Sequence, residues 1–262
     1  MSYHFGKCIF KPKEVLKMKK IIKNIFQKMG LQISKYQSYE LPSTLDVDLL
    51  RRQKIMNYFG INTVFDIGAN NGHYSTTLRE YGYSKKIISF EPLKQPFEEL
   101  KNVSENDDNW LVNNYAIGNA DCIGIINVAK NSLSSSLLKM LPAHLNSAPE
   151  SEYISKQEIK IKKLDTIFNS FCCDNDKVLL KIDTQGFEKN VIDGAVNCLK
   201  NIAIIQLEMS IIPLYENEML FNDMMKYIES KGFELYSLEN GFADQTTGRL
   251  LQIDGIFVKK SN

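Results

Sequence analysis

The sequence predicts a Rossmann-like α/β fold, with a mostly parallel β-sheet and helices on both faces of that sheet. The first observation is a buried-strand pattern at 63–68, which breaks into a glycine-bearing turn and then a helix. The second is an apolar run at 86–91 that closes on Glu91, as the next parallel strand of a nucleotide-binding fold does. The third is 203–209, a nearly unbroken apolar run that is typical of a strand buried on both faces.

Around the first two strands, the spacing of apolar residues predicts helices. The first helix spans 44–60, with Thr44 as its candidate N-cap. The elements that follow are a helix at 73–82, a helix at 95–105 and a third strand within 110–118 that runs into a loop. Pro96 suits the first turn of its helix, because the amide hydrogen that proline lacks would have no partner there.

The middle of the chain departs from this alternation. The β-rich segments 123–128 and 159–164 could pair as an antiparallel extension. Between them, 130–157 is an irregular insertion containing several serines and two prolines, and its length is typical of lids and binding loops. We expect a lid over the functional site, with a plain surface loop as the alternative.

The second half returns to alternating strands and helices. A strand at 178–183 leads into a helix that reaches about residue 199, and the strand at 203–209 leads into a helix at 217–230. The last two strands are expected at 233–238 and 252–258. A strand–turn–strand finish after five parallel strands would place one antiparallel strand in the sheet.

Charge divides the chain into two parts. The 262 residues carry a formal net charge of +1, but residues 1–45 hold nine lysines against Glu14 and Glu40, a net +7, which leaves −6 for the rest. We therefore expect a basic leader at 1–45 and a single domain at 46–262, which is long enough to bury one substantial core. An acidic body argues against nucleic acid as the main substrate.

The leader contains a predicted amphipathic helix at 12–30, in which apolar residues recur every three or four positions and lysines occupy much of the rest. This helix could contact an anionic membrane surface or a partner protein. The alternative is that it packs on its own domain with a solvated lysine face, as most amphipathic helices do. Five cysteines without a C-x-x-C pair indicate the cytoplasm, with the inner face of a membrane as a peripheral location.

The turn after the first strand indicates which nucleotide the fold would bind. Dinucleotide enzymes use G-x-G-x-x-G, but this turn reads Asp66-x-Gly68-x-Asn70-x-Gly72, with an acid in the motif and no glycine at 70. A carboxylate there would repel a pyrophosphate and suits a ligand that carries an ammonium and a sulfonium group. The expected cofactor is therefore S-adenosylmethionine, with Glu91 accepting the ribose hydroxyls.

Six short stretches between about residues 62 and 258 carry a resemblance to one family. They are Val64-Phe65-Asp66-Ile67-Gly68-Ala69-Asn70-Asn71-Gly72, Phe90-Glu91-Pro92, Asn114-Tyr115-Ala116-Ile117-Gly118, Ser134-Ser135-Ser136-Leu137, Leu164-Asp165 and Leu180-Lys181-Ile182-Asp183-Thr184-Gln185-Gly186-Phe187-Glu188. In this order they resemble the FkbM family of S-adenosylmethionine-dependent methyltransferases, which mostly methylate hydroxyl groups on sugars, polyketides and related small molecules. The resemblance implies a class I methyltransferase sheet of seven strands, with the last strand antiparallel.

The resemblance also implies a set of cofactor-binding residues. Asp66, Gly68, Asn70 and Gly72 would lie under the methionine part of the cofactor. Glu91 and Pro92 would lie at the ribose. The residues that would receive the adenine follow the third strand: Asn114, Tyr115 and Ala116.

Three carboxylates are the candidates for catalysis. Asp183 closes the fourth strand of the main sheet, at the crevice where such folds bind ligands, so it is the leading general base and also a cofactor-binding candidate. Glu188 and Glu208 are candidates for a second carboxylate. The alternatives are a helix N-terminal acid for Glu188 and an ion pair with Lys181 for Glu208.

Two other kinds of chemistry remain open at this point. Converging carboxylates could hold Mg²⁺, but they show no recognisable ligand spacing, so a divalent metal is possible without being expected. His73 could act as an acid–base group, although a histidine just after the turn more often packs locally.

The sequence thus favours an O-methyltransferase whose acceptor is a hydroxyl on a sugar, a glycan precursor or a related small molecule. One alternative is a nicotinamide-dependent sugar-nucleotide enzyme, which would need a third glycine in the turn. The other is a non-catalytic binding module that keeps the fold and is recruited by the basic leader.

Overall fold

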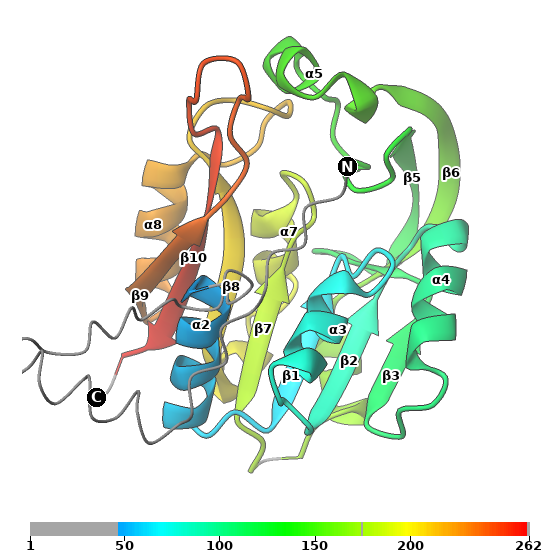
Figure 1. Cartoon of the computed structure of the whole chain (residues 1–262). Helices are drawn as coiled ribbons and strands as arrows, with labels where there is room; N and C mark the ends of the chain where they lie inside the picture. Colours follow the sequence, from blue (N-terminus) through cyan, green and yellow to red (C-terminus); the bar gives the residue numbers. More distant parts are fainter. Residues whose placement is uncertain (1–46, 174, 261–262) are drawn as a thin grey trace, which may run out of the picture. The chain divides into compact units, whose positions relative to one another are not determined.

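The computed structural model describes residues 47–173 and 175–260 (Figure 1). The basic leader, its predicted helix at 12–30 and the candidate N-cap Thr44 lie outside the described residues. Within the part that is described, no helix is both long enough and apolar enough to cross a membrane.

The main sheet has seven strands in the order β3-β2-β1-β7-β8-β10-β9. Their bounds are β1 Thr63–Ile67, β2 Lys86–Phe90, β3 Trp110–Asn113, β7 Val178–Ile182, β8 Ile202–Ser210, β9 Phe233–Asn240 and β10 Gln252–Lys259. Neighbouring strands from β3 to β8 are parallel, while β10 is antiparallel to both β8 and β9. The predicted class I methyltransferase sheet, with the last strand of the chain antiparallel, is therefore confirmed.

A second, smaller sheet lies beside the main one (Figure 1). Its order is β4-β6-β5, with bounds β4 Ala116–Ile117, β5 Cys122–Ala129 and β6 Tyr153–Lys162. The antiparallel pairing of β5 with β6 confirms the expected extension. The segment 110–118 forms two strands in different sheets, because Asn114 donates its side-chain amide to the backbone oxygens of Glu91 and Pro92, where the chain leaves the main sheet.

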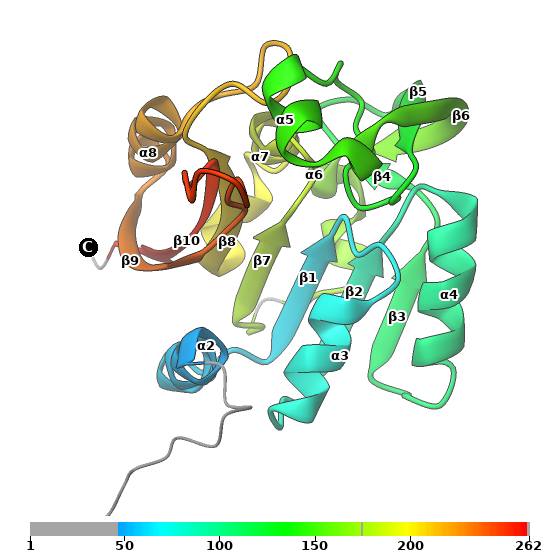
Figure 2. The ribbon, with the colours of Figure 1, turned by 45° about the horizontal axis from the view of Figure 1, so that its top comes forward.

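Helices cover both faces of the main sheet, and the strand pleat decides which apolar residues each helix meets. On one face, Val64 and Leu179 pack with α2 (Val47–Tyr58), α3 (His73–Glu80) and α4 (Lys94–Ser104), which Figure 2 shows on the near side of the strands. On the other face, Phe65 and Leu180 pack with α6 (Leu164–Ile167), α7 (Glu188–Asp193) and α8 (Phe221–Ser230).

Two predicted helices are shorter than expected. The helix after β7 ends at Asp193 instead of continuing to about 199, because a Cβ on Gly194 would lie 1.9 Å from the Gly118 backbone oxygen, a contact that only glycine permits. Helix α8 begins at Phe221 and not at 217, because the Glu218 carboxylate accepts backbone N–H groups and fixes a turn there.

Candidate functional site

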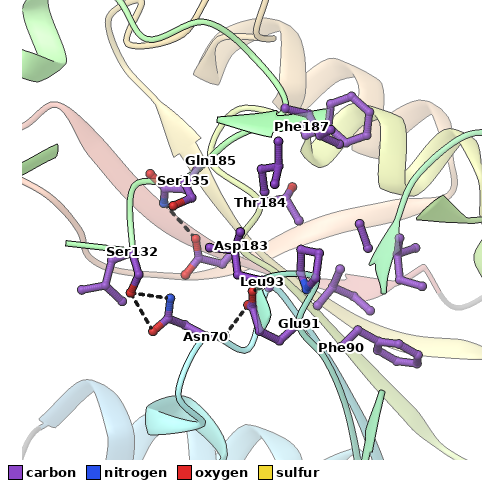
Figure 3. A pocket seen from close by; sticks show the side chains of 18 residues that line it. Asn70, Phe90, Glu91, Leu93, Ser132, Ser135, Asp183, Thr184, Gln185 and Phe187 are labelled. Carbon is purple, nitrogen blue, oxygen red and sulfur yellow. Dashed lines mark hydrogen bonds between the residues drawn. The ribbon is translucent and has the colours of Figure 1, made fainter. Parts of the chain in front are cut away.

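A pocket with a volume of about 640 Å³ lies at the carboxyl ends of β1, β2 and β7, beside the point where the strand order reverses (Figure 3). Its apolar lining residues come mainly from the end of β2, the small sheet and the segment after β7: Phe90, Leu93, Ala116, Ile117, Ile126, Leu137 and Phe187. Its polar lining residues are Asn70, Glu91, Ser132, Ser135, Asp183, Thr184 and Gln185. Few polar groups in a mostly apolar cavity are typical of a cofactor site.

The turn after β1 owes its shape to residues in the left-handed backbone region. Gly68, Asn70 and Gly72 have φ angles of 74°, 47° and 88°. A Cβ on Gly68 would lie 1.9 Å from the Asp183 backbone oxygen, so only glycine lets the turn pack directly on the end of β7. A Cβ on Gly72 would instead meet the Leu100 side chain of α4, which makes Gly72 a packing residue outside the pocket lining.

Glu91 connects the end of β2 to this turn. Its carboxylate accepts the backbone N–H of Asn70 and the backbone N–H of Leu93, each at 2.8 Å. The side chain lines the pocket although the residue is only 4% exposed. Burial raises the pKa of Glu91 to about 7, against the lowering effect of the two N–H groups and of Lys181.

Asp66 lies behind the turn, not in the pocket. It is fully buried and does not line the cavity. Lys181 Nζ lies 3.0 Å from its Oδ1, and the Ser75 hydroxyl donates to its Oδ2 at 2.8 Å. Lys181 also donates to the Gly68 backbone oxygen at 3.2 Å, so the ion pair supports the turn from beneath.

This placement changes the argument for a cationic ligand. The sequence suggested that the charge of Asp66 would face the ligand, but Lys181 neutralises that charge inside the core. The carboxylate that lines the pocket at the end of β2 is Glu91.

The three candidate catalytic carboxylates have different surroundings. Asp183 lines the pocket, its side chain is 41% exposed, and its Oδ2 lies 3.6 Å from Lys181 Nζ. Glu188 is buried, and its Oε1 accepts the backbone N–H groups of Thr184 and Gly186 at 2.9 and 3.2 Å. Its carboxylate therefore fixes the turn after β7, which agrees with the alternative interpretation as a helix N-terminal acid.

Glu208 lies behind Asp183 and outside the pocket lining. Its Oε2 accepts hydrogen bonds from Gln185 Nε2 at 3.0 Å and from Gln252 Nε2 at 2.8 Å, whereas no ion pair joins it to Lys181 among the described residues. Burial raises the pKa of Glu208 well above its ordinary value, and the charges of Asp183, Asp254 and Glu188 raise it further.

The insertion between β5 and β6 forms one wall of the pocket. The Ser132 hydroxyl meets the Asn70 side-chain amide at 3.1 Å, which joins the insertion to the turn after β1 (Figure 3). The Ser136 hydroxyl donates to the Gln185 backbone oxygen at 2.6 Å. The predicted insertion 130–157 is shorter in the structure, because β6 already begins at Tyr153. The insertion lies against the cavity at these serines, and its movement as a lid stays a prediction.

Of the remaining candidates, some line the cavity and others lie outside its lining. Asn114 is exposed and holds the chain at the end of β2, and the Tyr115 ring packs against Phe90. Of the three residues expected at the adenine, Ala116 lines the pocket, and so does Pro92 from the β2 end. His73 is exposed at the start of α3, outside the cavity lining.

A family model described as the methyltransferase FkbM domain matches residues 66–235, more than half of the chain and all of the pocket lining. The chain belongs to the FkbM methyltransferase family. The resemblance inferred from the motifs is therefore confirmed. Within the described part of this FkbM protein, no three His, Cys, Asp or Glu side chains gather as a metal site would require.

Solved structures similar to this FkbM family member have low sequence identity. An uncharacterised protein from Listeria monocytogenes has a TM-score of 0.47 at 8% identity, over 83% of this chain and 69% of that one. A putative RNA methyltransferase from Pyrococcus horikoshii has a TM-score of 0.44 at 12% identity, over 82% of this chain and 85% of that one. The third is the 1,6-didemethyltoxoflavin-N1-methyltransferase of Burkholderia thailandensis, solved with bound 1,6-didemethyltoxoflavin and S-adenosylhomocysteine. It has a TM-score of 0.46 at 8% identity, over 98% of this chain and 94% of that one. A comparison with curated proteins gives no match.

Several lining and supporting residues were not predicted. Gln185 and Ser135 lie in stretches that resemble the family, but the sequence alone did not indicate that they line the pocket. Tyr215, whose hydroxyl donates to Gln185 Oε1 at 2.7 Å, lies in the loop after β8 and had no signal in the sequence.

Proposed function

We propose that this FkbM family member is an S-adenosylmethionine-dependent methyltransferase that methylates a hydroxyl group on a sugar, a glycan precursor or a related small molecule. The observation that carries the cofactor assignment is Glu91. This buried carboxylate ends β2, lines an otherwise largely apolar pocket and is tied to the glycine turn through the Asn70 N–H. The proposal of a hydroxyl acceptor is supported by the resemblance to a family whose members mostly methylate hydroxyl groups.

The residues of the pocket fit the chemical groups of this cofactor. Each carboxylate oxygen of Glu91 accepts one backbone N–H and keeps a further lone pair, so the side chain can accept both hydroxyls of a ribose. Phe90, Leu93, Ala116 and Ile117 supply apolar surface for an adenine ring. Gly68 lets the backbone approach the ligand closely.

The cofactor, when bound, supplies an electrophilic methyl group, which is the reactive part of the chemistry. The chain has to hold the acceptor oxygen in line with that methyl group and to remove the proton of the hydroxyl. Asp183 is the proposed base, because its carboxylate is the one candidate of the three that lines the pocket. The acceptor proton would pass to a carboxylate oxygen of Asp183 as the acceptor oxygen bonds the methyl carbon, while the methyl–sulfur bond would break and leave its electron pair on a neutral thioether sulfur.

Family membership favours this function over the nicotinamide-dependent alternative. The non-catalytic alternative requires a direct test, because a methyltransferase fold can persist without turnover. Methyl transfer by the unaltered chain separates the two, and the Asp183→Asn variant, which keeps the shape of the side chain and removes its basicity, tests the base.

The experiment is incubation of the purified chain with S-adenosylmethionine carrying an isotopically labelled methyl group and with pooled cellular glycans, nucleotide sugars and small metabolites. We expect mass spectrometry to find the label on a hydroxyl oxygen, with the rate lowered ~10²–10⁴-fold in Asp183→Asn. Label on nitrogen would contradict the O-methylation, and equal rates in both proteins would place the base elsewhere.

A further inference from the structure

Gln185 joins two of the carboxylates near the pocket through a single nitrogen atom. Its side-chain Nε2 donates to Asp183 Oδ1 at 2.9 Å and to Glu208 Oε2 at 3.0 Å. Figure 3 shows the first of these hydrogen bonds at the edge of the cavity. A primary amide has two N–H groups, so one residue satisfies one acceptor on β8 and one at the end of β7.

Tyr215 determines which side of this amide faces the carboxylates. Its hydroxyl donates to Gln185 Oε1 at 2.7 Å and lies 3.2 Å from the Ser134 backbone oxygen. An ionised carboxylate only accepts hydrogen bonds, so a flipped amide would place its oxygen against the Asp183 carboxylate, the proposed base. The hydrogen bond from the Tyr215 hydroxyl to Oε1 stabilises the observed orientation, in which the amide nitrogen faces Asp183 and Glu208.

The backbone of this turn is fixed as firmly as the side chain. Gln185 has a φ of 54°, in the left-handed region that non-glycine residues rarely adopt. The Ser136 hydroxyl holds its backbone oxygen at 2.6 Å. A Cβ on Gly186 would lie 3.0 Å from the Cβ of Tyr215, so the glycine lets the turn approach the tyrosine. The chain therefore stabilises an uncommon conformation with contacts from two other segments, the insertion and the loop after β8.

We propose that Gln185 is a positioning residue for methyl transfer, which holds the Asp183 carboxylate in the orientation that meets the acceptor hydroxyl, with Tyr215 fixing the amide. This inference rests on the proposed function of Asp183 as the base. Gln185 orients one lone pair of Asp183 by engaging Oδ1, and it ties that carboxylate to the half-buried Glu208 on β8. Placement of a reacting group within a fraction of an ångström is a large part of catalysis, since an error of about 1 Å can cost ~10²-fold.

The test compares Gln185→Met with the matched control Gln252→Met. Both variants remove one amide donor from Glu208, but Gln252 does not contact Asp183. The first measurement is the affinity for S-adenosylhomocysteine by calorimetry. The second is a pH titration of the side-chain carboxyl carbons by NMR, with Asp183→Asn and Glu208→Gln providing the assignments. The third is the single-turnover rate of methyl transfer, with the acceptor that the labelling experiment identifies.

We expect Gln185→Met to keep the cofactor affinity within about threefold, to shift the carboxyl resonances of both Asp183 and Glu208, and to lower the transfer rate ~10²-fold. Gln252→Met should shift the carboxyl resonance of Glu208 and leave that of Asp183 unchanged. Tyr215→Phe, which keeps the ring and removes one hydroxyl, should reproduce the Asp183 shift in part.

An unchanged Asp183 resonance in Gln185→Met would overturn the inference, and so would equal transfer rates in Gln185→Met and Gln252→Met. These outcomes differ from a failure of the proposed function, in which the unaltered chain itself would not bind S-adenosylhomocysteine. The NMR comparison still decides the positioning of Asp183 in that case.

Discussion

Among single residues, Glu91 makes cofactor binding depend on pH. Burial raises its pKa to about 7, and the ionised form is the one that accepts hydrogen bonds from both hydroxyls of a ribose. Below that pH the ionised fraction falls, so affinity is expected to be greatest above pH 7 and to decrease on acidification. Calorimetry with S-adenosylhomocysteine should show about tenfold weaker binding at pH 6 than at pH 8. Glu91→Gln should bind weakly with no such slope, and a slope that persists there would assign the titration to another group.

The ion pair of Asp66 and Lys181 gives a second residue-level prediction. Asp66→Asn removes the nearest negative charge from a buried lysine, and breaking a buried pair by removing one partner costs about 3 kcal/mol or more of unfolding free energy. The double variant Asp66→Asn with Lys181→Met should recover much of that loss, because no buried charge is then left unpaired and Asp183, the other partner of Lys181, is 41% exposed. Urea unfolding measures both values. Full stability of the single variant together with lost ligand binding would instead mean that Asp66 contacts the cofactor directly.

The sequence predicted the residues whose role depends on local spacing. Gly68, Asn70, Glu91 and Asp183 all line the pocket, because each lies at or just after the carboxyl end of a strand that periodicity identifies. Asp66 was wrongly expected to face the ligand. Its environment is set by Lys181, which pairs with it in register on the neighbouring strand β7, and a single sequence does not show which strands are neighbours.

Among the elements, the insertion between β5 and β6 gives the prediction that concerns ligand exchange. The hydrogen bond between Ser132 and Asn70 joins this insertion to the turn after β1, beside the cavity. If the segment opens as a lid, Ser132→Ala should raise the dissociation rate of S-adenosylhomocysteine about fivefold, because one hydrogen bond contributes about 1 kcal/mol.

Stopped-flow displacement measures that rate. Ser155→Ala is the matched control, since Ser155 is an exposed serine of β6 outside the pocket lining. Equal dissociation rates in the two variants and the unaltered chain would favour the alternative that the insertion is a fixed wall.

Local sequence patterns predicted most of the helices and strands but not all of their boundaries. The strands of the main sheet and helices α3 and α4 follow from the periodicity of apolar residues. The early end of α7 was not predicted, because it depends on the backbone of Gly118, a residue far away in the chain, lying against Gly194. The division of 110–118 into β3 and β4 likewise depends on the contact of Asn114 with the end of β2.

For the whole molecule, we predict that the acidic body binds the cofactor without the basic leader. All residues that line the pocket lie between 67 and 187, so removal of residues 1–45 should change the affinity for S-adenosylhomocysteine by no more than about twofold. Sedimentation with anionic vesicles compares the two hypotheses for the leader. Vesicle binding by the full chain but not by the truncated chain would support a membrane contact, and binding by neither would support packing on the domain.

A seven-stranded sheet with an antiparallel last strand was predictable as a whole because the motifs occur in family order. The roles of the candidate carboxylates were not predictable, because they depend on contacts that form only when the sheet brings Glu208 on β8 beside Asp183 and Gln185 after β7.

The central claim is that the pocket at the ends of β1 and β2 binds a sulfur nucleoside through Glu91. The most direct measurement is calorimetric titration of the unaltered chain, of Glu91→Ala and of the control Glu98→Ala, an exposed acid on α4, with S-adenosylhomocysteine. We predict saturable one-to-one binding for the unaltered chain and for Glu98→Ala, with at least ~10²-fold weaker binding for Glu91→Ala. No binding by the unaltered chain at ~1 mM ligand, or equal affinity in all three proteins, would contradict the claim.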